Sequence, residues 1–226
     1  CALPISIHEV LIQEGIRDTA LEGEIKKRRI PVKVLGRKKM DQLLNGNHQG
    51  IAACIDDYKT WELEELLESI PQGKQPLLVM LDGLEDPHNL GAILRTCDCI
   101  RADGVIIGKH RNVRLTPTVA KVSTGAIDTV KVSVVTNLVQ AIKYLKKQGY
   151  WVVGTDFENS RDYREGQYDV PLVLVIGSEG FGISSLVKKN CDYCVRLPME
   201  GSVSSLNASV ATGILLYQIH AQRHPL

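Results

Sequence analysis

Three short segments of the chain concentrate polar side chains that could act on an alcohol or bind a phosphate. The first, residues 81–96, leaves a predicted strand through a turn rich in Asp, Gly and Pro and contains Asn89 and Arg95. Ligands of open α/β sheets bind where strands end, so these two side chains could hold a phosphate and a sugar there. Two structural alternatives compete: Asn89 could cap a helix, and Arg95 could form a surface ion pair with Asp98.

The second segment, residues 173–183, runs from a buried strand into a loop with three glycines. Glycine allows the backbone to approach a ligand closely, so the loop predicts a cofactor site. Its spacing, Gly-x-x-Gly-x-Gly, differs from the Gly-x-Gly-x-x-Gly pattern typical of dinucleotide binding, and Glu179 would repel a pyrophosphate. A cofactor with an adenosine and a cationic centre suits the loop better.

The third segment, residues 197–213, places hydroxyl and amide groups where a loop meets a helix predicted to begin at Leu206. Capping by Ser204 or Ser205 is the simple explanation. Asn207 would then lie inside the first turn, where asparagine is not preferred, which favours a functional role for it. The small residues that follow predict close packing of this helix, within the domain or across a dimer.

The order of elements around these segments predicts an α/β fold. Strand and helix patterns alternate, and the strands are continuous apolar runs, as in a parallel sheet covered on both faces. The expected strands are residues 77–81, 104–107, 151–154, 170–176 and 193–197, and the expected helices are residues 89–100, 138–148, 184–190 and 206–222.

The N-terminal region predicts a separate small α/β domain. We expect a helix that includes residues 8–12, strands at 30–35 and 51–55, and a helix at 61–70. A break with two prolines and a glycine then suggests a linker, which gives domains at residues 1–70 and 77–226 joined by residues 71–76. Because the chain opens at Cys1 and not at a methionine, we expect the first domain to be incomplete at its N-terminus.

A cluster of positive charge marks the small domain. Residues 26–39 hold eight basic side chains and no acidic one, whereas the whole chain has a net charge of only +1. Any nucleic-acid partner must therefore be held by such a local patch, and its binding would be salt-sensitive. The alternative is a solvated helix end and strand. The candidate RNA contacts are Lys26, Lys27, Arg28, Arg29, Arg37 and Lys38, with Lys33 and Lys39 beside them.

Composition and cysteine spacing exclude other classes. The charged and hydrophobic fractions, 23% and 44%, are ordinary for a globular protein. Six scattered cysteines indicate reduced thiols in a cytoplasmic protein. The longest apolar run is about half a membrane span, and no signal peptide is visible. Cys97 and Cys99 are too close for a usual zinc pair, and Cys191 and Cys194 would face opposite sides of a strand, so we expect no metal.

Taken together, the three segments resemble the SpoU (TrmH-like) family of RNA ribose 2′-O-methyltransferases. The motifs Asn89-Leu-Gly-Ala-Ile-Leu-Arg95-Thr, Ile176-Gly-Ser-Glu-Gly180 and Ser204-Ser-Leu-Asn-Ala-Ser209 follow the family's order and spacing. The resemblance covers residues 46–222, and the basic domain looks like the family's L30-like RNA-binding domain. It implies an α/β fold knotted as a deep trefoil (SPOUT type), a homodimer, and S-adenosyl-L-methionine as the cofactor.

The resemblance also implies roles for single residues. Catalytic positions fall on Asn89, Arg95, Glu179, Ser205 and Asn207, and cofactor contacts fall on Thr155, Gly177, Gly180, Leu197 and Leu206. Arg95 would be the general base; because guanidinium groups stay protonated in proteins, a phosphate clamp is the alternative. Glu179 would shape the cofactor loop and could bond to Asn89 or Arg95.

The substrate is expected to be RNA. Within the family, the extra domain and the Glu200-Gly-Ser-Val-Ser-Ser sequence resemble bacterial enzymes that methylate a guanosine of 23S ribosomal RNA. Transfer RNA, or an adenosine of ribosomal RNA whose methylation confers antibiotic resistance, are alternatives. A non-catalytic RNA-binding or ribosome-assembly factor is a different class, against which the intact polar motifs argue. A nucleotide-dependent oxidoreductase is the weakest alternative.

Overall fold

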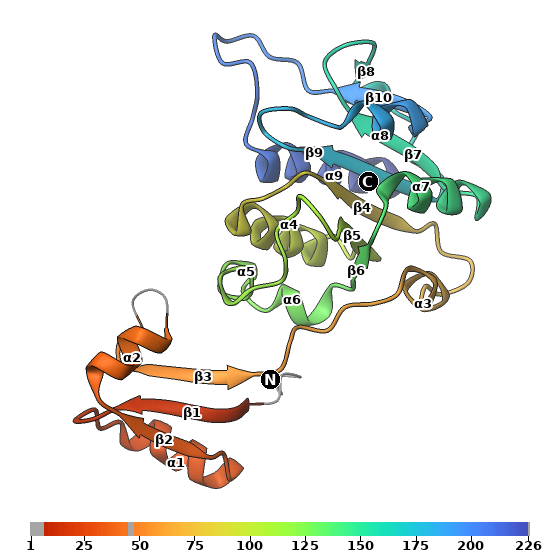
Figure 1. Ribbon diagram of the computed structural model, residues 1–226. Coiled ribbons are helices and arrows are strands. Elements are labelled where there is room, and N and C mark those ends of the chain that lie inside the picture. The colour runs from red at the N-terminus through yellow and green to blue at the C-terminus, as the bar shows by residue number, and fades with distance from the viewer. Residues whose placement is uncertain (1–6, 45–47, 226) are drawn as a thin grey trace. The chain divides into compact units, whose positions relative to one another are not determined.

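The computed structural model describes residues 7–44 and 48–225, which form two compact units divided between Tyr58 and Lys59 (Figure 1). The division precedes the predicted linker because the first helix after Tyr58 belongs to the second unit. This helix, α3 (Leu63–Glu68), buries Leu63 and Leu66 in the core of that unit. The assignment of residues 1–70 to an RNA-binding domain stays a prediction.

The small unit is a three-stranded sheet with two helices. Strand β1 lies in the centre, parallel to β2 and antiparallel to β3. Leu11, Leu35 and Met40 form the buried core of this unit, between the sheet and helix α2. The elements are β1 (Ile7–Gln13), α1 (Thr19–Arg28), β2 (Val32–Leu35), α2 (Arg37–Leu43) and β3 (Ile51–Ile55).

The helix expected over residues 8–12 is wrong, because this segment is part of β1. β-Branched residues such as Val10 and Ile12 favour extended backbone. As the central strand, β1 also has hydrogen-bonding partners on both edges. The strands predicted at residues 30–35 and 51–55 are confirmed as β2 and β3.

The large unit is built on a seven-stranded sheet in which all strand pairs are parallel, as predicted. The strand order is β6-β5-β4-β9-β7-β10-β8, so β9, late in the chain, lies between β4 and β7. The strands are β4 (Leu77–Asp82), β5 (Gly104–Gly108), β6 (Val132–Val135), β7 (Trp151–Thr155), β8 (Arg161–Asp162), β9 (Leu172–Gly177) and β10 (Tyr193–Arg196).

Helices cover both faces of this sheet (Figure 1). On one face, α3, α7 and α8 pack on alternate strand residues such as Leu78 and Met80. On the other face, α4 packs against α5, α6 and α9. The segments α5 and α6 and strand β6 carried no clear sequence signal. The helices are α4 (Pro87–Cys99), α5 (Pro117–Ser123), α6 (Ala126–Thr129), α7 (Leu138–Lys147), the 3-10 helix η1 (Tyr163–Glu165), α8 (Ser185–Asn190) and α9 (Ala208–Arg223).

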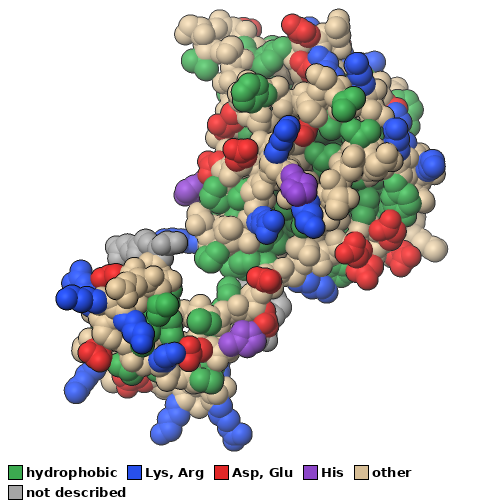
Figure 2. Space-filling model, in the orientation of Figure 1, with side chains coloured by type: hydrophobic (Ala, Val, Ile, Leu, Met, Phe, Trp, Pro, Cys, Tyr) green, Lys and Arg blue, Asp and Glu red, His purple; other side chains and the backbone are tan. Residues whose placement is uncertain are grey.

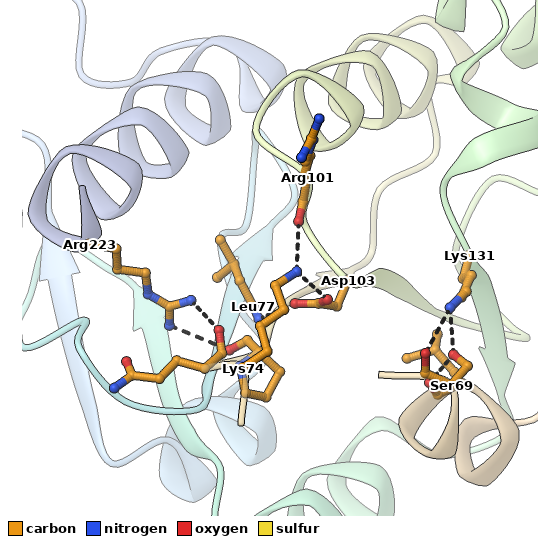
Figure 3. Close-up of polar contacts among 10 residues, drawn as sticks. Ser69, Lys74, Leu77, Arg101, Asp103, Lys131 and Arg223 are labelled. Carbon is orange, nitrogen blue, oxygen red and sulfur yellow. Dashed lines mark hydrogen bonds and ion pairs between the residues drawn. The ribbon is translucent and has the colours of Figure 1, made fainter. Parts of the chain in front are cut away.

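The last residue of α9 anchors this helix at the edge of the sheet where the parallel strands begin (Figure 3). The Arg223 guanidinium donates to the carbonyls of Gln75, Tyr168 and Val170 at 2.8, 2.8 and 2.6 Å. Lys74, nearby, donates to Asp103 at 2.6 Å. With its C-terminal end fixed there, α9 presents its first turn at the opposite edge, where the strands end.

Two further features bear on the expected fold. Among the described residues, no helix has the length and apolar character that crossing a membrane requires. The threading of the C-terminal segment through a loop, which the resemblance implies, stays a prediction.

Candidate functional site

Three predicted catalytic residues, far apart in sequence, meet where β9 ends and α9 begins. Asn89 Nδ2 donates to Glu179 Oε1 at 2.9 Å, as the sequence had indicated for this pair. Asn207 Nδ2 donates to the same oxygen at 2.7 Å and to Asn89 Oδ1 at 2.9 Å. The backbone amide of Ala208 also donates to Glu179 Oε1, at 3.2 Å. We call Asn89, Glu179 and Asn207 the junction, because three donors on one carboxylate oxygen fix all three segments together.

The beginning of α4 leaves Asn89 free for this junction. Asp86 is the N-cap of the helix, accepting from the backbone amide of His88 at 2.9 Å, and Pro87 occupies the first turn. Hydrogen bonds from His88 lower the pKa of Asp86. Asn89 is buried inside the first turn. The alternative that Asn89 is itself a cap is therefore wrong, and its burial is explained by its partners in the junction.

The beginning of α9 uses one side chain for two purposes. Asn207 is the N-cap: its Oδ1 accepts from the backbone amides of Ser209 and Val210 at 3.0 and 3.3 Å. Its Nδ2 meanwhile donates into the junction. The expectation that the helix begins at Leu206 with Ser204 or Ser205 as its cap is thus wrong. The residue that seemed out of place in a helix interior lies just before it.

The glycine loop after β9 is a tight turn. Ser178 and Gly182 exchange backbone hydrogen bonds at 3.1 and 2.9 Å, so the turn folds back on the end of the strand. A Cβ on Gly177 would lie 2.0 Å from the carbonyl carbon of Gly182, which only glycine avoids. Gly180, in contrast, faces open space.

A cavity of about 450 Å³ opens beside this turn, at the ends of β7, β9 and β10. All five predicted cofactor residues line it: Thr155, Gly177, Gly180, Leu197 and Leu206. Glu179 and Ser205 line it as well, whereas Asn89, Arg95 and Asn207 do not. The structure therefore gathers the cofactor candidates into one cavity and places the junction next to it through Glu179.

The cavity is lined by apolar side chains on one side and by carboxylates on another. Ile176, Val195 and Leu215 give it an apolar side, and Asp156 and Glu158 bring carboxylates to its rim. This lining fits an adenine ring together with a positively charged group, since a flat apolar ring packs on aliphatic side chains and a cation is attracted by carboxylates.

Sequence reasoning missed the carboxylates. Asp156 and Glu158 directly follow β7, and their position after a parallel strand was the available signal. Asp156 forms an ion pair with Lys188, which raises the pKa of that lysine. Glu158 is exposed and has no ion pair within the described chain, so its charge remains available to a ligand.

Arg95 lies apart from the junction. It follows Asn89 by six residues on α4, which turns its side chain by about 240° and moves it about 9 Å along the helix. The Arg95 side chain is exposed, and within the described residues it forms no hydrogen bond or ion pair. Asp98, proposed as its ion-pair partner, instead accepts from the Thr129 hydroxyl at 2.6 Å. The ion-pair alternative is therefore wrong.

The basic residues of the small unit are all exposed, and Figure 2 shows lysine and arginine side chains projecting from this unit. Acidic residues just outside the cluster pair with some of them: Glu24 lies 3.2 Å from Arg28, and Asp41 lies 3.9 Å from Arg37. Such exposed pairs are weak. We call the predicted contacts the basic surface: Lys26, Lys27, Arg28, Arg29, Arg37 and Lys38.

The two cysteines near β10 lie together. Cys191 directly follows α8 and lies two residues before β10, the strand that holds Cys194, and a Cβ on Gly154 would lie 3.0 Å from each sulfur. The expectation that they face opposite sides is wrong, because Cys191 is outside the strand. The neighbouring Cys191 thiol lowers the pKa of Cys194. In the described part of the chain, no three metal-ligating side chains gather into a possible metal site.

Comparison with known proteins defines the class of this molecule. An AdoMet-bound rRNA methyltransferase from Sinorhizobium meliloti superposes with a TM-score of 0.76 at 25% identity, covering 99% of this chain and 82% of that one. The TrmH/SpoU tRNA modifying enzyme of A. aeolicus superposes with a TM-score of 0.62 at 32% identity, over 71% and 82% of the two chains. The fold is therefore that of an RNA methyltransferase.

The sequence comparisons identify the family. Residues 76–217 match the SpoU rRNA Methylase family, and residues 2–61 match the RNA 2′-O ribose methyltransferase substrate-binding domain. A TrmH family tRNA/rRNA methyltransferase of Staphylococcus haemolyticus is 48% identical over 97% of this chain and 90% of its own length. A Bacillus subtilis protein of the same description is 48% identical over 89% and 81%. The chain belongs to the SpoU methylase family, as its motifs had indicated.

Proposed function

We propose that this protein transfers a methyl group from S-adenosylmethionine to the ribose 2′-hydroxyl of a nucleotide in structured RNA, and that the target is a guanosine of 23S ribosomal RNA. The observation that carries the proposal is the junction of Asn89, Glu179 and Asn207 beside the cavity. Both matched family models support methylation of RNA. The relatives' names leave ribosomal and transfer RNA open.

The cavity would hold the cofactor. Its apolar wall, including Leu197 and Leu206, would pack on the adenine, and the backbone of the turn after Gly177 would lie against the ribose. Glu158 and Glu179 would face the positive charge of the methionine portion. When bound, the sulfonium supplies a methyl group that is already activated, so the protein must only align the hydroxyl and remove its proton.

The junction would orient the nucleotide that is methylated. Its donors and acceptors hold the end of β9 and the beginning of α9 as one rigid frame, next to Ser205 at the mouth of the cavity. Alignment in a near-attack geometry can contribute about 7–11 kcal/mol to catalysis. We assign Asn89 and Asn207 to this alignment and Ser205 to a hydrogen bond with the nucleotide.

A second copy of the chain would complete the site. Val210, Ile214 and Tyr217 follow one another at helical spacing along α9 and are exposed, which leaves an apolar stripe on a helix end that adjoins the site. We propose that this stripe packs against a second copy. Arg95 lies on α4, which packs against α9. A dimer through this face would let Arg95 act in the site of the partner, either as a phosphate clamp or in removing the hydroxyl proton.

The test is methyl transfer from isotopically labelled S-adenosylmethionine to RNA from cells that lack the endogenous gene. The RNA is separated by size, digested to nucleosides and analysed by mass spectrometry, with Asn89→Ala as the matched variant. We expect 2′-O-methylguanosine in large ribosomal RNA with the wild type and not with the variant. Label in transfer RNA or in adenosine would correct the substrate. No label in any fraction, with a folded protein that binds the cofactor, would contradict the proposed function.

A further inference from the structure

A second cavity adjoins the first at the ends of β4, β5 and β6. Its volume is about 490 Å³, and it shares Ser178, Phe181 and Gly182 with the cofactor cavity. Sites of open α/β sheets lie at this edge of the sheet. We call this second cavity the groove. None of the residues that line it was predicted as a site residue.

One wall of the groove is a positively charged loop. Lys109, His110, Arg111 and Arg114 follow β5 and are all exposed, with no acidic residue among residues 109–114. Within the described chain, none of these four side chains has an ion pair or a side-chain hydrogen bond. His110 and Arg111 line the groove directly. Unpaired cations at a site edge attract a polyanion.

The loop is held rigidly. The Leu84 amide donates to Asn112 Oδ1 at 2.9 Å, and the Val113 amide donates to the Leu84 carbonyl at 2.7 Å. The Lys109 amide donates to the Val135 carbonyl at 2.8 Å. Arg111 has a φ of 58°, a left-handed backbone that non-glycine residues adopt rarely. These hydrogen bonds hold the backbone around Arg111 in place against Leu84, which precedes α4, despite the strained φ of Arg111.

The other features of the groove favour a nucleic acid over a simple anion. Phe181 is 96% exposed, at the border between the two cavities, where its ring is free to stack on a base. The first residues of α7 line the groove, and a helix N-terminus favours a phosphate. Of the two carboxylates present, Asp82 already accepts from the Ser184 amide at 2.7 Å, and Glu85 is exposed.

We propose that this groove binds the single-stranded RNA that flanks the methylated nucleotide, with Arg111 contacting a backbone phosphate and Phe181 stacking on a base. A base must leave its helix to stack on a side chain, so the target would lie in a loop, bulge or end of the RNA. This inference rests on the proposed function, because it assigns a role in recognising the same substrate.

The experiment measures binding of a fluorescein-labelled 12-nucleotide oligouridylate over a range of salt concentrations, and methyl transfer to ribosomal RNA, with cofactor affinity determined by calorimetry. Arg111→Ala is expected to lower the slope of log K against log[salt] by about 0.7 for the single lost phosphate contact. Phe181→Ala should weaken binding about tenfold, and Phe181→Trp should retain it. Glu85→Gln should strengthen binding, since it removes a carboxylate from the groove. Both weakening variants should raise KM for RNA. Arg111→Ala should also leave cofactor affinity unchanged, because Arg111 does not line the cofactor cavity.

Lys147→Ala is the matched control, because Lys147 is an exposed cation at the far end of α7 and its removal should change none of these values. If the Arg111 and Phe181 variants bind RNA as the wild type does, or if Phe181→Ala loses only cofactor affinity, the groove does not hold RNA and the inference is overturned. Failure of the proposed function would look different: the wild type itself would transfer no methyl group.

Discussion

The junction and the basic surface use polar side chains in opposite ways. In the junction, Asn89, Glu179 and Asn207 each form a hydrogen bond with a side chain from another segment, and Asn89 is buried. On the basic surface every side chain is exposed, and the partners present, Glu24 and Asp41, come from neighbouring turns. A group with fixed partners can position a reacting atom, whereas an exposed cation can attract a polyanion but cannot orient it.

The difference predicts that single substitutions in the junction act far more strongly than those on the surface. Asn207→Ala removes both the cap and the junction donor. We expect a loss of about 1 kcal/mol in the free energy of unfolding from the cap. Methyl transfer should fall by about 10²- to 10³-fold, because the hydroxyl and the methyl donor are no longer aligned. Single-turnover kinetics and denaturant unfolding measure the two effects.

Asn207→Ser separates these roles, because serine caps a helix but cannot donate an amide N–H to Glu179 and Asn89 at the same time. It should recover most of the stability and little of the activity. An active Asn207→Ser enzyme would show that Asn207 only caps α9, and the comparison between the junction and the surface would lose its main support.

Arg95 tests whether an exposed cation can nevertheless be essential. Because it has no partner in the described chain, Arg95→Ala should change the free energy of unfolding by no more than about 0.5 kcal/mol. Activity should still fall by about 10²-fold if the guanidinium stabilises charge in the partner's site. Mixing Arg95→Ala with Asn207→Ala subunits should restore part of the activity, since one site in the mixed dimer is then intact. No recovery on mixing would place Arg95 in the site of its own chain.

Gly177 and Gly180 belong to the same loop, but only Gly177 is packed against other backbone atoms. Gly177→Ala brings a methyl group against the backbone of Gly182, so we expect a loss of about 1–3 kcal/mol in the free energy of unfolding. We also expect at least tenfold weaker cofactor binding by calorimetry, because the turn must move. Gly180→Ala meets nothing and should stay within about 0.5 kcal/mol of the wild type. Equal effects at the two positions would contradict the structure of the turn.

The sequence was sufficient for what local pattern determines. The buried strands β4 and β9 are continuous apolar runs, and both were predicted nearly to the residue. Asn89, Glu179 and Asn207 were found because their motifs are specific. The contact between Asn89 and Glu179 was also foreseen, and the structure adds that Asn207 donates to both.

Predictions from the sequence failed where a residue's structure depends on contacts with segments that are distant in the sequence. The helix expected over residues 8–12 is a strand because β2 and β3 pair with it on both sides. The cap of α9 was misplaced because Asn207 acquires its second role only when α4 and β9 meet it. Phe181 and Arg111 drew no attention, since the position of an exposed side chain at the wall of a cavity is a property of the folded chain alone.

The basic surface should give the smallest effects, and they should be additive. Lys26, Arg29 and Lys38 have no ion pair within the described residues, so each neutralisation to alanine should remove one phosphate contact. The slope of log K against log[salt] for structured RNA should fall by about 0.7–0.9 per residue, with methyl transfer at saturating RNA unchanged. Lys147→Ala serves as the control. A surface that only solvates a helix end would leave the slope unchanged in all three variants. A loss of kcat at saturating RNA would instead show that these cations orient the substrate, and the division of labour between the junction and the basic surface would be wrong.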